Sequence, residues 1–265
     1  SDLGKKLFAR LGSYRTTVSA NAMQIHAFTF ATVRLALIDA WRLANATRAV
    51  SIAYSLLFVA GGLAIMGGLL ALGRAPFVIA AVGAFMLVGP AILAGFFGIA
   101  HSHETGGRPG LGSVAAGFAA ATPALWALAL VCGLLFMIFI TDAAILYAYM
   151  VGGAPVWLGD LAPAAAGVVG FVKWAAISGW IVALLLYCIS AFSVPLLCER
   201  RAGLVDAVVI SVRVVLGNFG PAISWAFLLS TATIASILLL PLLPLTLPWL
   251  AYASRALYRR VLPPG

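Results

Sequence analysis

The chain has 265 residues, of which 64% are hydrophobic and only 9% charged, with a mean hydropathy of +1.12. Ordinary soluble domains are about 45–50% apolar and about 25% charged, so the composition excludes a water-soluble globule. Several apolar runs reach the roughly 20 helical residues that cross a bilayer. We therefore expect an all-α fold, a polytopic membrane helical bundle.

Six apolar segments predict about six transmembrane helices. The first two would form a hairpin with a tight turn at Gly73–Pro76, and the sixth is rich in proline. Proline removes backbone donors, so we expect this last segment to be kinked or to span only part of the membrane. The six segments are residues 50–72, 77–100, 123–150, 171–197, 221–240 and 241–258.

The positive charge predicts orientation. Six spans place both termini on one side, and fourteen of the sixteen cations then share that side, leaving Arg74 and Lys173 for the other face. By the positive-inside rule we expect a multi-pass protein of the bacterial inner (cytoplasmic) membrane with both termini cytoplasmic. The cations thus mark topology, and no nucleic-acid partner is predicted. Residues 1–6 lack the apolar core of a secretory signal.

Three regions are expected: a basic cytoplasmic N-terminal extension over 1–35, a six-span transmembrane domain over 36–260 and a C-terminal tail over 261–265. The extension contains an aromatic patch, Met23–Phe30. Such a tail is expected to be mobile unless it is tied down. Anionic phospholipid headgroups or the surface of a partner subunit would hold it.

Shorter amphipathic helices precede some spans and are expected at the membrane interface. The clearest covers Gly203–Gly217, where Asp206 and Arg213 lie opposite an apolar face of Val205, Val208, Val209, Val212, Val215 and Leu216. Weaker examples cover Leu35–Ala46 and Leu111–Ala121. Each precedes a pair of spans whose second member contains a proline, which indicates a threefold helical-hairpin repeat; coincidence is the alternative. The prolines are Pro90, Pro195 and Pro248.

One segment resembles a known family. The run SVPLLCERRAGLVDA over 193–207, continuing to Asn218 and Trp225, is similar to the signature of an uncharacterised six-span bacterial integral membrane family, a domain of unknown function. That signature is a VPLL-x-(D/E)-R turn followed by an A-x3-S-x-R-A-x3-N helix. Looser landmarks extend the resemblance over residues 36–260. It implies a fold and no activity, and its signature residues here are Pro195, Glu199, Arg200 and Asn218.

Two ionisable residues fall within apolar segments. Asp142 and Lys173 both lie toward the non-cytoplasmic end, where they could form an intramembrane ion pair across the hairpin. A structural pair or snorkelling to the interface is the simpler interpretation, and a proton relay is the alternative.

Catalytic, metal and cofactor sites are not predicted. Cys132, Cys188 and Cys198 lack metal-site spacing, and His101 and His103 are two residues apart at a helix end, so their rings point in different directions. No histidine lies within a span to activate a hydroxyl. We therefore expect neither an enzyme nor a cofactor-binding protein.

Small residues predict close helix packing, either within the chain or against a neighbouring subunit. Tryptophan and tyrosine residues near the segment ends are typical of interfacial belts. The packing glycines are Gly61, Gly62, Gly67, Gly68, Gly95 and Gly98, and the belt residues are Trp41, Trp157, Trp174, Trp180, Trp249, Tyr252 and Tyr258.

The leading hypothesis is a non-catalytic accessory or structural subunit of a larger bacterial inner-membrane complex, with a respiratory, energy-converting complex such as a terminal oxidase as the example. This example reflects how abundant such assemblies are, not a residue pattern. The first alternative is a small-solute transporter or channel, and the second is a lipid-binding or assembly factor. A water-filled midplane cavity would favour transport, lined by Ser190, Ser193, Thr231, Thr233 and Ser236.

Overall fold

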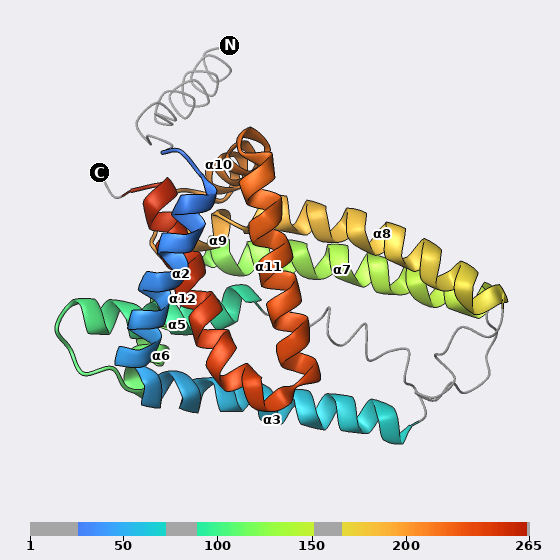
Figure 1. The fold of residues 1–265 in the computed structure, drawn as a ribbon, viewed down its shortest axis with the longest axis horizontal. Helices are drawn as coiled ribbons and strands as arrows, with labels where there is room; N and C mark the ends of the chain where they lie inside the picture. The colour runs from blue at the N-terminus through green and yellow to red at the C-terminus, as the bar shows by residue number, and fades with distance from the viewer. Residues whose placement is uncertain (1–25, 73–88, 151–165, 264–265) are drawn as a thin grey trace, which may run out of the picture.

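A computed structural model describes residues 26–72, 89–150 and 166–263 of the chain, and every regular element in these ranges is a helix (Figure 1). The all-α prediction is therefore confirmed. The helices are α2 (Phe30–Ala46), α3 (Arg48–Ala71), α5 (Gly89–Glu104), α6 (Leu111–Ala120), α7 (Pro123–Met150), α8 (Ala166–Ser190), α9 (Ser193–Cys198), α10 (Leu204–Gly217), α11 (Phe219–Leu238), the 3-10 turn η2 (Leu240–Leu242) and α12 (Leu243–Val261).

Four helical stretches in the described ranges are long and apolar enough to cross a membrane. They are Arg48–Ala71, Pro123–Met150, Lys173–Cys198 and Phe219–Ser236. They correspond to the first, third, fourth and fifth predicted segments. Of the second segment, residues 77–88 lie outside the described residues, as do Gly73–Pro76, and α5 covers the rest. The predicted number of six spans is not confirmed.

The expected sixth span has a different place in the fold. The turn η2 interrupts it, and α12 is not among the helices apolar enough to cross a membrane. Ten of its nineteen residues are buried, and it packs against α2, α3 and α5. The last turn carries Arg259 and Arg260, and Arg255 is itself buried. A charged, protein-covered helix of this kind forms the centre of the fold rather than a lipid-facing span.

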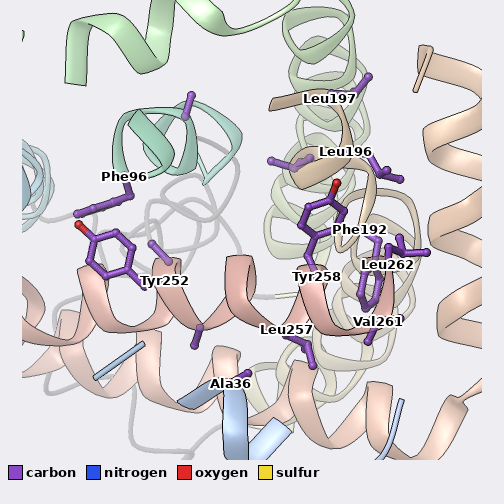
Figure 2. Close-up of a cluster of buried hydrophobic side chains, with 14 of the residues drawn as sticks. Ala36, Phe96, Phe192, Leu196, Leu197, Tyr252, Leu257, Tyr258, Val261 and Leu262 are labelled. Carbon is purple, nitrogen blue, oxygen red and sulfur yellow. The ribbon is translucent and has the colours of Figure 1, made fainter. Parts of the chain in front are cut away.

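Aromatic and branched side chains from α5, α9 and α12 form the core shown in Figure 2. Tyr252 lies edge-on to Phe96 with ring centroids 5.7 Å apart, and Tyr258 points toward Leu196. Each large buried apolar side chain contributes about 1.5–3 kcal/mol relative to an exposed one.

Part of the aromatic patch in the expected N-terminal extension packs against the core of this chain. The side chain of Phe28 is buried and packs edge-on against Phe192 at 5.8 Å, and the backbone N–H of His26 donates to Val261 O at 2.9 Å. Helix α2 begins at Phe30, five residues before the predicted start, because Thr29 and Thr32 form a capping box. The end of the extension is therefore held by this chain, while residues 1–25 lie outside the described residues.

The long helices extend away from this core. In Figure 1, α3, α7 and α8 project in a common direction from the cluster that contains α2, α5, α9 and α12, whereas α11 runs across that direction. In the apolar stretch of α3 only 17% is buried inside the protein. The corresponding share is 22% in α7 and 33% in the stretch over 173–198. Most of their apolar surface therefore faces outward.

The three predicted interfacial segments are helical, as α2, α6 and α10. In α10, however, the buried side chains are Ala207, Ser211, Val214 and Val215. Val205, Val209 and Leu216, which belong to the predicted apolar face, are exposed. Ala207 and Ser211 thus face the protein together with Val214 and Val215, while three of the six predicted face residues point outward. Nothing described here tests the threefold repeat, which stays a prediction.

The predicted packing glycines fall into two groups. A Cβ on Gly95 would collide with the Tyr54 ring, and one on Gly98 would collide with the α6 backbone, so both serve contacts inside the chain. Gly61, Gly62, Gly67 and Gly68 on α3 have no described atom of another element within 4 Å of an added Cβ. No described residue covers that strip of α3.

Candidate functional site

Four charged side chains meet where α5, α9 and α12 approach one another. Glu104 ends α5, Glu199 caps α9, and Arg255 and Arg259 lie one turn apart on α12. Both terminal nitrogens of Arg255 donate to the Glu104 carboxylate, one of them at 2.9 Å. Arg259 donates to Glu104 Oε2 at 3.0 Å and to Glu199 Oε1 at 2.9 Å. We call these four residues the ion cluster; it joins three helices.

Arg255 is the most deeply placed member, at 4% exposure. Its Nε has no hydrogen-bond partner and lies 3.6 Å from Glu199 Oε1, while the guanidinium lies 5.7 Å from the centroid of the Phe97 ring. A buried charge is costly unless opposite charges and hydrogen bonds compensate it. The two carboxylates are therefore needed to keep Arg255 in place.

The electrostatics favour the charged forms of Glu104 and Arg259. Burial by itself raises the pKa of Glu104, but the hydrogen bonds and charges of Arg255 and Arg259 outweigh burial and hold that pKa below its ordinary value. Burial lowers the pKa of Arg259, and the carboxylates of Glu199 and Glu104 more than compensate, so its pKa is raised. With two arginines and two glutamates, the formal net charge of the cluster is zero.

The turn at the end of α9, which carries the signature residues Glu199 and Arg200, connects this cluster to the rest of the fold. Helix α9 ends in a Schellman motif: Arg201 N donates to Leu196 O at 2.9 Å and Arg200 N to Leu197 O at 3.2 Å. Arg200 occupies the left-handed position, with φ of 54°, where glycine is the usual residue. Its Nε donates to Ala120 O, 2.9 Å away at the end of α6, which helps to compensate the backbone strain.

The next residue faces the end of the chain. Arg201 donates to Tyr258 Oη at 2.7 Å and to the carbonyls of Leu262 and Pro263, each at 2.6 Å. Burial and the Glu199 charge raise the pKa of Tyr258 to about 12 despite Arg201, so its hydroxyl stays neutral at physiological pH. Three consecutive residues, from Glu199 to Arg201, thus tie α9 to α12, α6 and the C-terminal segment.

The other signature residues are placed differently. Pro195 is buried within α9. Asn218 caps α10 and donates to Val214 O at 3.0 Å, so it serves the α10–α11 junction rather than the ion cluster. Asp39 of α2 pairs with Arg260, which gives α12 a further ionic link. The sequence motif identified Glu199 and Arg200 but not the residues that they bind. The pairing of Arg255 with Glu104 was not predicted, because 151 residues separate the two along the chain.

A cavity of about 700 Å³ lies beside the ion cluster, between α5, α6, α9 and α12. Ser102, Thr105, Ser113 and Arg200 contribute polar groups to its lining, together with His101. Both carboxylates of the ion cluster are already held by arginines, so neither is free to act as a base. Within the described ranges no three His, Cys, Asp or Glu side chains are grouped to hold a metal ion.

A second, more open hollow of about 550 Å³ lies between α2, α11 and α12. Its lining is mostly apolar, with Leu37, Leu228 and Trp249 among its residues, and includes Arg34 and Arg42. We call it the apolar groove.

The remaining predicted residues lie away from both hollows. Asp142 on α7 and Lys173 on α8 are exposed, and the ion pairs of the described residues include none between them. Trp157 lies outside the described residues. Neither hollow is lined by any of the five hydroxyl residues expected around a transport site. Ser190 and Ser236 donate to carbonyls of their own helices, and Ser193 of α9 donates to Ile189 O at the end of α8.

Comparison with known families bears on the membrane assignment. Residues 77–199 match the family described as predicted integral membrane protein (DUF2189), so the match covers somewhat less than half of the chain. The expected resemblance to an uncharacterised membrane family is confirmed, whereas the signature motif is not, since Arg200 and Asn218 lie beyond the matched residues. No curated protein and no solved structure matches the chain. The protein is a membrane protein with helices able to span a bilayer.

Proposed function

We propose that the chain is a non-catalytic accessory subunit of a larger complex in the bacterial inner membrane. The observation that carries the proposal is the open face of α3. Its first two turns are held by buried Ser51, Tyr54 and Ser55, but the rest projects from the core with a glycine strip that no described residue covers. Small residues in a span let another helix approach closely, which in a membrane favours helix association. A neighbouring subunit is the occupant we expect there.

The polar part of the fold supports a structural role. The conspicuous charged residues form ion pairs with one another and connect helix ends. An active site needs a poised acid, base or nucleophile facing a substrate. We therefore assign the ion cluster to holding the central helices together, which keeps the face presented to the partner rigid.

The proposal extends to topology and partners. The charge distribution supports cytoplasmic termini, and we expect anionic phospholipids as further partners. A respiratory complex such as a terminal oxidase is the class that we would examine first.

Co-purification tests the proposal. Native membranes carrying the tagged full chain would be solubilised in mild detergent, and every chain in the particle identified. The variant G61L/G68L fills one face of α3, because these residues are seven apart and lie on the same side of the helix. L63F/L70F enlarges the opposite face at the same spacing and is the matched control.

We expect defined partner chains in constant ratio with the unaltered protein and with L63F/L70F, and their loss with G61L/G68L while membrane insertion persists. A lone monomer or a homo-oligomer would contradict the proposal. Partners without haem spectra would exclude the terminal oxidase and leave the accessory role intact.

A further inference from the structure

We propose that the apolar groove binds one anionic glycerophospholipid, with its phosphate between Arg34 and Arg42 and an acyl chain along α11. The inference is independent of the accessory-subunit proposal, since it concerns a different face. It rests on the lining of the groove, on two cations that pair with no described residue and on the position of the groove beside the candidate spans.

The lining suits an acyl chain. Leu37 and Ile38 of α2, Leu228 of α11 and Trp249 of α12 line the groove, whose volume lies within the roughly 300–1,000 Å³ of small-molecule sites. Trp41 packs edge-on against Trp249 with ring centroids 6.2 Å apart, and Trp249 donates its Nε1–H to Leu37 O at 3.0 Å. The tryptophan pair is therefore fixed, and tryptophan is the residue typical of the membrane interface.

No described acidic residue compensates the charge at the groove. Arg34 and Arg42 are exposed, lie eight residues apart on α2 and make no hydrogen bond or ion pair with another described residue. Asp39, the acid of that helix, is already paired with Arg260. At about 1.5 Å per residue the two arginines are about 12 Å apart along the axis. Two guanidinium groups that no described residue binds, beside an apolar groove, complement a phosphate attached to a hydrocarbon chain.

The groove also adjoins two candidate spans. Helix α2 ends at Ala46, and α3, the first candidate span, begins at Arg48, so α2 adjoins the membrane surface. Ser224 and Leu228, on the other wall, belong to the candidate span over 219–236. Helices α2, α11 and α12, which form the groove, contact one another (Figure 1). The groove thus lies between a helix that carries two cations and a helix apolar enough to span a membrane.

Lipid binding to the purified full chain in detergent would test this. Phosphatidylglycerol and phosphatidylcholine with identical acyl chains would be titrated separately, and bound lipid counted by native mass spectrometry. The variants are R34Q/R42Q, which removes the charge, and S224F, which narrows the groove and keeps both arginines. R213Q is the matched control, because Arg213 is an exposed arginine on α10 that does not line the groove.

We expect one phosphatidylglycerol to bind more tightly than phosphatidylcholine, and its affinity to fall about fivefold for each arginine removed. S224F should weaken binding of phosphatidylglycerol, and R213Q should leave it unchanged. Equal affinity for the two lipids, or an equal loss in R213Q, would overturn the proposal in favour of unspecific attraction to the surface. Unchanged binding in S224F with an unchanged melting profile would place the lipid elsewhere.

Discussion

Gly98 of α5 and Gly117 of α6 face each other at a backbone-to-backbone crossing. A Cβ on Gly98 would lie 2.2 Å from Ser113 O and 2.7 Å from the Gly117 Cα, and one on Gly117 would lie 2.2 Å from Ala94 O. Backbone atoms cannot move aside as a flexible side chain can. The two helices therefore approach this closely only because both positions lack a side chain.

Gly98→Ala and Gly117→Ala should each destabilise the protein by about 1–3 kcal/mol, the usual cost of overpacking, despite the better helix propensity of alanine. The measurement is the thermal unfolding midpoint in detergent. Gly112→Ala on α6 is the matched control, because nothing lies within 4 Å of its added Cβ, and it should be neutral or slightly stabilising. Equal behaviour of all three variants would mean that α5 and α6 do not cross this way.

Glu104→Gln should lower stability by about 1–3 kcal/mol, because Arg255 loses its bidentate partner while buried. The loss stays below that of a fully buried pair, since 39% of the Glu104 side chain is exposed and Glu199 still lies near Arg255. Unfolding curves would measure it. Asp142→Asn, which removes an exposed carboxylate, should show no such loss, and an equal effect of the two would refute a specific role of the ion cluster.

The stability difference between the unaltered protein and Glu104→Gln should depend on pH. The pKa of Glu104 is depressed in the folded protein from its ordinary value of 4.5. Its stabilising contribution is therefore fully present above that ordinary value and is lost as the pH falls through the depressed one. Unfolding midpoints measured from pH 7 to pH 3 should converge for the two proteins at the acidic end. Curves that stay parallel would show that Glu104 is not stabilised as a carboxylate.

Tyr252→Phe should cost about 1 kcal/mol. The Tyr252 hydroxyl lies 2.7 Å from Ser51 Oγ and 3.1 Å from Thr47 Oγ1, all in buried side chains, and this contact joins α12 to the start of α3. Removing it leaves two buried hydroxyls with one partner fewer. Tyr149→Phe, at a side chain that is 88% exposed, provides the comparison. An unfolding midpoint equal to that of Tyr149→Phe would mean that this hydroxyl cluster does not stabilise the fold.

The orientation can be measured with single cysteines in a background where Cys132, Cys188 and Cys198 are replaced by alanine. We expect Tyr149→Cys, near the end of α7, to react with a membrane-impermeant maleimide in cells whose outer membrane is permeabilised. Arg213→Cys on α10 should react only after the inner membrane is opened, because cations stay on the cytoplasmic side. The reverse labelling pattern would invert the predicted topology.

Sequence patterns located the long helices well. The predicted third span over 123–150 coincides with α7, because proline begins the helix and an uninterrupted apolar run fixes its length. The face of α10 was predicted less well. In a membrane protein both lipid and neighbouring helices accept apolar side chains, so periodicity alone cannot separate the two environments. Burial of Ala207 and Ser211 follows the rule that small residues pack between helices.

The sequence by itself determined the class of the protein, since only a bilayer accommodates a chain this apolar, and it determined where α3, α7 and α11 lie. The tertiary structure decided that α12 is central and that Glu104, Glu199, Arg255 and Arg259 form one cluster. The physical reason is the distance along the chain over which each interaction acts. Hydropathy and helix periodicity act over neighbouring residues, whereas an ion pair between side chains 151 positions apart exists only once the helices have packed.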